Sequence, residues 1–251
     1  MEVNGYSIEP GAILRNADLS GASLAEANLS GADLNNANLR MADLSGADIS
    51  GAKLRRADLY EADLNHSDLY SADLYEANLS EAELADADLT GANLYKANLH
   101  SADLSRANLR MADLTDCDMK KANLVNANLS GARLRNANLS MADLDNSDLS
   151  SSDLSGCRLH SAFLRSANLR NADLTVANLY NAKLTDADLT GANLTGADLT
   201  GADLRNANLT GANLSKANLT IANLTNANLN GTNLTNTNLN SATMPDGSTH
   251  D

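Results

Sequence analysis

Leucine recurs at every fifth position of this chain from Leu14 to Leu239, with isoleucine or methionine in its place in three units, the last at Met244. Two residues before each of these positions stands alanine or another small residue, and the residue between them is usually Asp or Asn. A period of five matches neither the 3.6-residue period of a helix nor the two-residue period of a long strand. The chain must therefore turn within every five-residue unit.

The second residue after each leucine carries the chemistry of this turn. It is Gly in 12 units and Asn in 10, and both residue types accept the positive φ that the third position of a type II turn requires. The alanine and the leucine are two residues apart, so they point to the same side of a short extended stretch. The repeat therefore predicts an interior of Ala and Leu inside a polar surface.

Because 47 such units follow one another without a break over residues 12–244, the chain resembles the pentapeptide repeat family. Its last residues, 244–251, are similar to the ends of cyanobacterial members. The resemblance implies an all-β fold, a right-handed quadrilateral parallel β-helix of about 12 coils in which residues 20 apart lie above one another. With ~4.8 Å between coils, the rod would be roughly 56 Å long.

The repeat also divides the chain. Residues 1–11 precede the regular units, and Val3, Tyr6 and Ile8 are suited to a cap over the first coil, since an uncovered coil presents unpaired backbone groups. Residues 12–244 form the predicted β-helix. Residues 245–251, which begin with a Pro-Asp-Gly turn, form a short C-terminal tail.

Composition excludes several classes of protein. A net charge of -14 in 251 residues argues against direct binding of nucleic acid, and two cysteines are too few for a disulfide-stapled domain. No apolar run approaches the ~20 residues of a membrane span, and the first residues lack the pattern of a secretion signal. We therefore expect a cytoplasmic protein with no membrane contact.

Acidic residues are concentrated in one segment, residues 57–95, which contains no Lys or Arg. On the four-sided model this segment forms an acidic belt of about two coils, and it is a candidate surface for binding a partner. The acidic belt consists of Asp58, Glu61, Asp63, Asp68, Asp73, Glu76, Glu81, Glu83, Asp86 and Asp88.

The 20-residue spacing also places other side chains next to one another. Lys53 would lie between Asp33 and Asp73, and Arg133 between two further aspartates. Such pairs favour a charge ladder, although the abundance of Asp in this column leaves coincidence as the alternative.

Three aromatic residues are candidate surface contacts. Tyr75 and Tyr95 are 20 residues apart, and Arg55 lies one coil earlier. They could stack on each other, but separate solvent-facing tyrosines are the simpler expectation. Phe163 occupies the Asp/Asn column and should point outward, either as a local packing feature or as a partner contact.

The sequence contains no recognisable catalytic or metal-binding arrangement. Cys117 and Cys157 lie in the small inward column two coils apart, ~10 Å, so we predict two buried free thiols. The histidines are predicted to be exposed and too far apart to share a metal ion: His66, His100, His160 and His250. We therefore expect no enzymatic activity and no cofactor.

Two functions remain. The first is a scaffold or regulatory protein that binds a protein partner through its rigid faces. The alternative is an acidic DNA mimic that binds DNA gyrase or another type II topoisomerase, as the family resemblance implies for some members. The average charge, about one per 4 Å of rod against one per ~1.7 Å of DNA, favours the first. The nearly uncharged stretch from Asn206 to Pro245 is the candidate surface for self-association.

Overall fold

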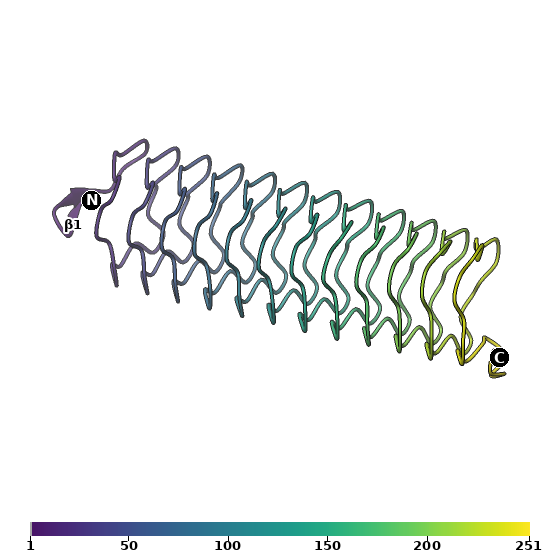
Figure 1. Cartoon of the computed structure of the whole chain (residues 1–251). Helices are drawn as coiled ribbons and strands as arrows, with labels where there is room; N and C mark the ends of the chain where they lie inside the picture. Colours follow the sequence, from purple (N-terminus) through teal and green to yellow (C-terminus); the bar gives the residue numbers. More distant parts are fainter. Residues whose placement is uncertain (1) are drawn as a thin grey trace.

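The computed structural model describes residues 2–251, and its chain winds into coils that stack along one axis (Figure 1). Parallel bridges join residues 20 apart throughout, from Ile13 with Asp33 to Asn223 with Thr243. Four units therefore complete each coil, and the protein is a right-handed quadrilateral parallel β-helix. The predicted fold and its 20-residue register are confirmed.

Each corner of the coil is a tight turn closed by one backbone hydrogen bond. The Ala17 N–H donates to the Leu14 carbonyl at 3.1 Å, and the same pair of positions repeats in the following units. Positive φ occurs at every fifth residue from Asn16 to Ser241, as a type II turn demands. Even the β-branched Val176 adopts a φ of 52°, so the stacked coils impose this conformation on residues that disfavour it.

Two sets of hydrogen bonds hold the polar column in place. In the backbone, the Asp33 N–H donates to the Ala12 carbonyl below it at 2.8 Å, and the Leu14 N–H donates to the Asp33 carbonyl at 2.7 Å. In the side chains, Asp18 Oδ1 accepts from the Ser20 N–H at 3.2 Å, a bond from a residue to its second neighbour. This bond recurs in many units and explains why Asp and Asn precede the turn.

The interior consists of the predicted alanine and leucine columns, which are buried along nearly the whole rod. Cys117 and Cys157 occupy the small column. Both are buried and neither forms a disulfide, so the prediction of two free thiols is confirmed. Their Sγ atoms lie 2.7 Å from the carbonyl oxygens of Leu94 and Leu134. Burial raises the pKa of the Cys157 thiol to about 12, which keeps it protonated and unreactive.

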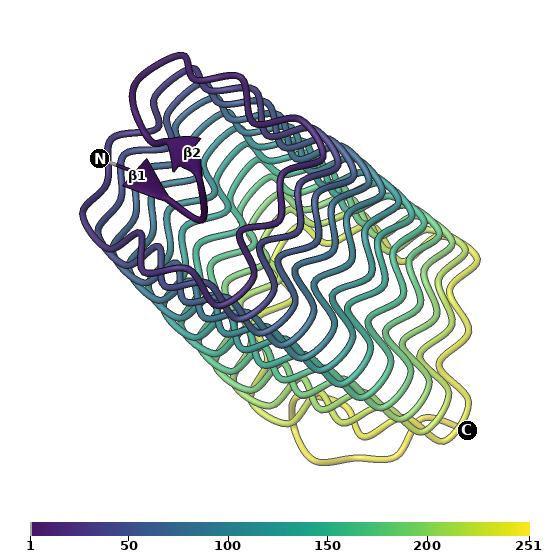
Figure 2. The same cartoon turned by 90° about the vertical axis from the view of Figure 1, so that its left-hand side faces the viewer.

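The two ends of the rod differ. At the N-terminal end, β1 (Glu2–Val3) and β2 (Tyr6–Ser7) form an antiparallel hairpin that lies across the first coil (Figure 2). Val3 and Tyr6 pack against the hydrophobic core, and Ile8 is buried in it. This hairpin occupies the position that a cap requires.

At the C-terminal end, the tail folds back on one side of the last coil. Thr249 forms an antiparallel bridge with Thr243, and the His250 N–H donates to the Ala242 carbonyl at 2.8 Å. Leu234 and Leu239 nearby are only partly buried. The tail thus pairs with one face through an isolated bridge and leaves the last leucines accessible.

Candidate functional site

The first four coils carry their charge unevenly around the rod. One side, which we call the acidic face, consists of residues 21–31, 41–51, 61–71 and 81–91, because the 20-residue register stacks these ranges. It contains ten carboxylates and no Lys or Arg. They are Glu26, Asp43, Asp48, Glu61, Asp63, Asp68, Glu81, Glu83, Asp86 and Asp88.

The opposite side of the same coils, which we call the mixed face, consists of residues 12–20, 32–40, 52–60 and 72–80. It contains five basic and five acidic residues, so its formal net charge is zero. Its arginines reach carboxylates of the next coil, as Arg15 does to Asp33 at 2.6 Å and Arg40 to Asp58 at 3.1 Å. The net negative charge of the first four coils therefore comes from the acidic face alone.

The predicted acidic belt is divided by these contacts. Its members do surround the rod, but four of them pair with an arginine: Asp58, Asp73, Glu76 and Asp86. The other six have no Lys or Arg partner within the described part of the chain, and all six lie on the acidic face: Glu61, Asp63, Asp68, Glu81, Glu83 and Asp88.

The arginine partners also set the ionisation of the paired carboxyl groups. The Arg56 guanidinium donates a hydrogen bond to Glu76 and lowers its pKa, and Arg106 lowers the pKa of Asp86 in the same way. The Tyr75 hydroxyl also donates a hydrogen bond to the Glu76 carboxylate, and this bond raises the pKa of Tyr75. At neutral pH these two carboxylates are ionised and the Tyr75 phenol is neutral.

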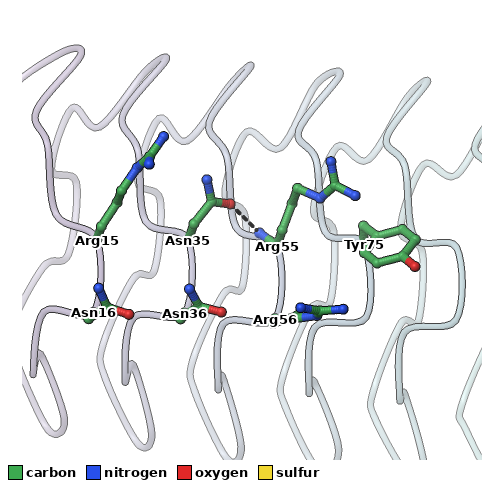
Figure 3. A pocket seen from close by; sticks show the side chains of 7 residues that line it. All are labelled: Arg15, Asn16, Asn35, Asn36, Arg55, Arg56 and Tyr75. Carbon is green, nitrogen blue, oxygen red and sulfur yellow. Dashed lines mark hydrogen bonds between the residues drawn. The ribbon is translucent and has the colours of Figure 1, made fainter.

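A cavity of about 410 Å³ opens on the corner of the mixed face, and we call it the arginine notch. Its lining forms two rows along the rod (Figure 3). The upper row in this view contains Arg15, Asn35, Arg55 and Tyr75, and the lower row contains Asn16, Asn36 and Arg56. The lining thus carries three guanidinium groups and no carboxylate.

Tyr75 and Tyr95 do not stand apart as separate solvent-facing rings, and this simpler expectation is wrong. Their rings stack with centroids 5.7 Å apart, and the Arg55 guanidinium lies 4.4 Å from the Tyr75 centroid. The 4.8 Å step between coils brings side chains of one column within stacking distance. The result is a rigid column of one guanidinium and two phenol rings, flanked by Lys96 at 5.2 Å from the Tyr95 centroid.

The other candidate residues lie apart from this corner. Phe163 is 39% exposed and contacts the Arg165 guanidinium at 5.5 Å from its ring centroid. Arg133 forms an ion pair with Asp113 at 3.6 Å. Lys53 is flanked by Asp33 and Asp73 in the backbone ladder, yet these two aspartates pair with arginines instead.

The histidines remain dispersed. His160 Nδ1 lies 2.9 Å from the Ser140 hydroxyl, and His66 lies 3.9 Å from an Asp86 carboxylate oxygen. Over residues 2–251, no three His, Cys, Asp or Glu side chains are grouped so that they could hold a metal ion. In the same range, no helix has the length and hydrophobicity needed to cross a membrane.

Sequence reasoning missed the arginine notch. Arg15 and Arg55 occupy one column 40 residues apart, with the short Asn35 between them, and this spacing is visible in the sequence. The acidic face could also have been found by counting charges in each column. The direction in which each guanidinium extends, however, follows only from the side-chain arrangement in Figure 3.

The sequence matches a known protein family and is similar to several solved structures. A family model described as pentapeptide repeats matches eight times, and its matches together span residues 12–246. No curated protein matches the chain. Among solved structures, HetL from the cyanobacterium Nostoc sp. strain PCC 7120 shares 40% identity, with 91% of this chain and 94% of that chain covered and a TM-score of 0.43.

Two further structures are similar over smaller parts or at lower identity. Rfr23, from the cyanobacterium Cyanothece 51142, is 36% identical over 46% of this chain and 63% of that chain, with a TM-score of 0.21. Full-length QnrB1, a plasmid-mediated fluoroquinolone resistance protein, is 22% identical over 78% of this chain and 90% of that chain, with a TM-score of 0.32.

Proposed function

This chain belongs to the pentapeptide repeat family, and we propose that it is a non-enzymatic scaffold or regulatory protein that binds a protein partner through its rigid outer faces. The observation that carries the proposal is the uneven surface of a uniform rod. The interior repeats Ala and Leu along the chain, whereas ten carboxylates, of which only Asp86 pairs with an arginine among residues 2–251, gather on one side of the first four coils. A solenoid presents such a surface without rearrangement, which lowers the entropic cost of binding.

Several properties support this function over catalysis. Enzymes gather reactive groups in a water-restricted pocket, while the arginine notch is lined by Arg, Asn and one Tyr and contains no carboxylate, serine, cysteine or histidine. Pentapeptide repeat proteins are generally interaction proteins. In this proposal the protein acts in the cytoplasm, where thiols such as those of Cys117 and Cys157 stay reduced.

The test is to recover partners by cross-linking in source cells and then measure binding with each purified candidate. We expect saturable binding that weakens at least tenfold when Asp63→Asn and Glu83→Gln are combined on the acidic face. The matched control is Asp173→Asn, in the outward column of another part of the rod. Failure of every purified candidate to bind would contradict the proposal.

The acidic face favours a second function, a DNA mimic that binds a type II topoisomerase. Its ten carboxylates span four coils, about 19 Å, which is about one charge per 2 Å on one side of the rod and close to one per ~1.7 Å of duplex DNA. The average charge per unit length of the whole rod is lower and conceals this local charge density.

DNA gyrase tests this alternative directly. Inhibition of supercoiling by the purified protein, relieved by salt and by combining Asp63→Asn, Asp68→Asn and Glu83→Gln, would support mimicry. Unchanged supercoiling at micromolar protein would exclude it. The control variant combines Asp153→Asn and Asp173→Asn, which remove carboxylates far from the acidic face.

We further propose self-association of two copies through the C-terminal coil. Only Lys216 is charged between Asn206 and Pro245, so two copies would meet there with little electrostatic repulsion. The last leucines of the β-helix, Leu229, Leu234 and Leu239, are only partly buried. Light scattering should show a dimer that Asn233→Lys converts to a monomer, while Asn93→Lys, in the same column in mid-rod, leaves it unchanged. A monomeric parent protein would exclude this mode.

A further inference from the structure

The arginine notch retains hydrogen-bond donors that the protein does not use. Arg15 and Arg56 donate through Nε to Asp33 and Glu76, at 2.6 and 2.7 Å. The terminal nitrogen atoms of these two guanidinium groups have no hydrogen-bond acceptor among the described residues. Arg55 is freer still, since its nearest carboxylate oxygen, on Asp73, is 3.8 Å from Nε and beyond hydrogen-bonding distance.

The shape of the notch is fixed before any ligand arrives. Asn35 forms its floor, where its Oδ1 accepts from the Arg55 N–H at 3.0 Å and its Nδ2 donates to Asp33 Oδ1 at 2.8 Å. Asn35 is shorter than Arg15 and Arg55, which extend on either side of it two coils apart, about 10 Å (Figure 3). A gap between two long cationic side chains is the result.

One wall of the notch is equally rigid. Tyr75 is held between the Arg55 guanidinium on one side and the Tyr95 ring on the other. This stacking fixes the plane of the Arg55 guanidinium, and a guanidinium held in place loses less entropy when it forms paired hydrogen bonds with an oxyanion. Arg and Tyr are also among the residue types enriched at the centres of protein interfaces.

We propose that the arginine notch binds an oxyanion side chain, a carboxylate or a phosphoryl group, on an extended segment of the protein partner. The proposal rests on the proposed scaffold function and names the chemistry of its partner. Three guanidinium groups with unused donors favour a ligand that brings one or two anionic groups. A long polyanion such as nucleic acid is disfavoured, because the rest of the protein carries a strongly negative charge.

The chain contains a matched site that lacks these properties. Arg135 occupies the same column as Arg55, and it lies 3.8 Å from Asp153 just as Arg55 lies 3.8 Å from Asp73. Its neighbours in the column and at the corner are Ser155 and Asn136, so it has neither a tyrosine to stack on nor an arginine at the corner position, and nearby Arg133 is paired with Asp113. Arg135 therefore serves as the control for Arg55.

Three fluorescein-labelled nonapeptides of otherwise identical sequence test the proposal by fluorescence anisotropy with the full chain. One carries two glutamates, one carries two phosphoserines, and the third carries two glutamines. We expect at least one anionic peptide to bind five times more tightly than the glutamine peptide. Arg55→Gln should weaken this binding at least fivefold and Arg135→Gln less than twofold.

Each outcome decides the question. Binding of the glutamate peptide assigns the site to carboxylates, and binding of the phosphoserine peptide alone assigns it to phosphoryl groups. Equal binding of all three peptides, or equal losses in Arg55→Gln and Arg135→Gln, would overturn the inference. Arg55 is on the surface, so unchanged circular dichroism of both variants will show that the fold is intact.

The partner assay separates this inference from the proposed function. If a purified partner binds the parent protein and the combined Arg55→Gln and Arg56→Gln variant equally well, the inference fails and the scaffold function stands. If no partner binds but an anionic peptide does so in an Arg55-dependent manner, the scaffold function fails and the oxyanion site stands.

Discussion

In the first four coils, both arginines and amides link the surfaces of neighbouring coils, whereas amides and hydroxyls do so in the last coils. Arg56 reaches Glu76 one coil above it at 2.7 Å. Towards the C-terminus, the Asn213 amide donates to the Thr195 hydroxyl at 2.9 Å, and the Asn238 amide donates to Thr220 at 3.0 Å. The leucine column continues through both regions, although its last members are only partly buried. Charge is therefore not needed to build the coil, and its placement in the first four coils carries information about binding.

The largest effect on stability is expected from leucine substitutions in the interior, which test whether leucine packing stabilises both regions equally. Leu124 is completely buried in mid-rod, whereas Leu234 is partly buried in the last coil. Leu124→Ala should lower the free energy of unfolding by ~2 to 5 kcal/mol, because it leaves a cavity between packed coils. Leu234→Ala should cost less than half as much. Urea unfolding followed by circular dichroism measures both, and equal losses would show that the last coil is packed as tightly as the middle.

The second comparison concerns the two ends. Deletion of residues 2–8 removes the buried Ile8 and the packed Val3 and Tyr6, so we expect a loss of ~1.5 to 3 kcal/mol and faster hydrogen exchange in the first coil. Deletion of residues 246–251 removes only backbone pairing on one face, and its effect should be smaller and confined to the last coil. Hydrogen exchange with mass spectrometry resolves the two ends. A larger effect from the second deletion would assign the capping role to the tail.

Much of the fold follows from the sequence, because a period of five with small and large apolar residues in fixed columns permits few backbones. The free thiols of Cys117 and Cys157 follow from the same register. The arginine notch does not follow, since it depends on which way each guanidinium extends over Asn35. The Tyr75 and Tyr95 stack also required the structure, because the column permits both stacked and separate rings.

The third prediction concerns the turns, which are alike in both regions. Val176 has a φ of 52°, in a region that β-branched residues disfavour. Val176→Gly should therefore stabilise the protein by about 1 kcal/mol, although the greater flexibility of glycine in the unfolded chain offsets part of the gain. Val125 is the matched control, because it precedes the positive-φ position of its turn, and Val125→Gly should destabilise the protein. Thermal unfolding measures both, and a loss of stability in Val176→Gly would show that valine packing outweighs backbone strain.

The smallest effect concerns the origin of the low carboxyl pKa values in the two regions. The hydrogen bond from Arg106 lowers the pKa of Asp86, whereas the hydroxyl of Ser248 lowers that of Asp246 at the C-terminal end. Arg106→Gln should raise the pKa of Asp86 towards its ordinary value of ~3.9 and leave Asp246 unchanged. Carboxyl carbon shifts in an NMR pH titration measure both groups.

The sign of the linked stability follows from the direction of this shift. A carboxyl group whose pKa is lowered by folding stabilises the protein above its unfolded pKa, and this contribution disappears as the pH falls through the folded pKa. For Asp86 the loss therefore occurs below about pH 4, and Arg106→Gln should make the stability less dependent on pH in that range. Added salt should raise the pKa of Asp86 more than that of Asp246, because a charged partner is screened and a hydroxyl is not. Equal responses to salt would mean that Asp86, like Asp246, is held by hydrogen bonding rather than by charge.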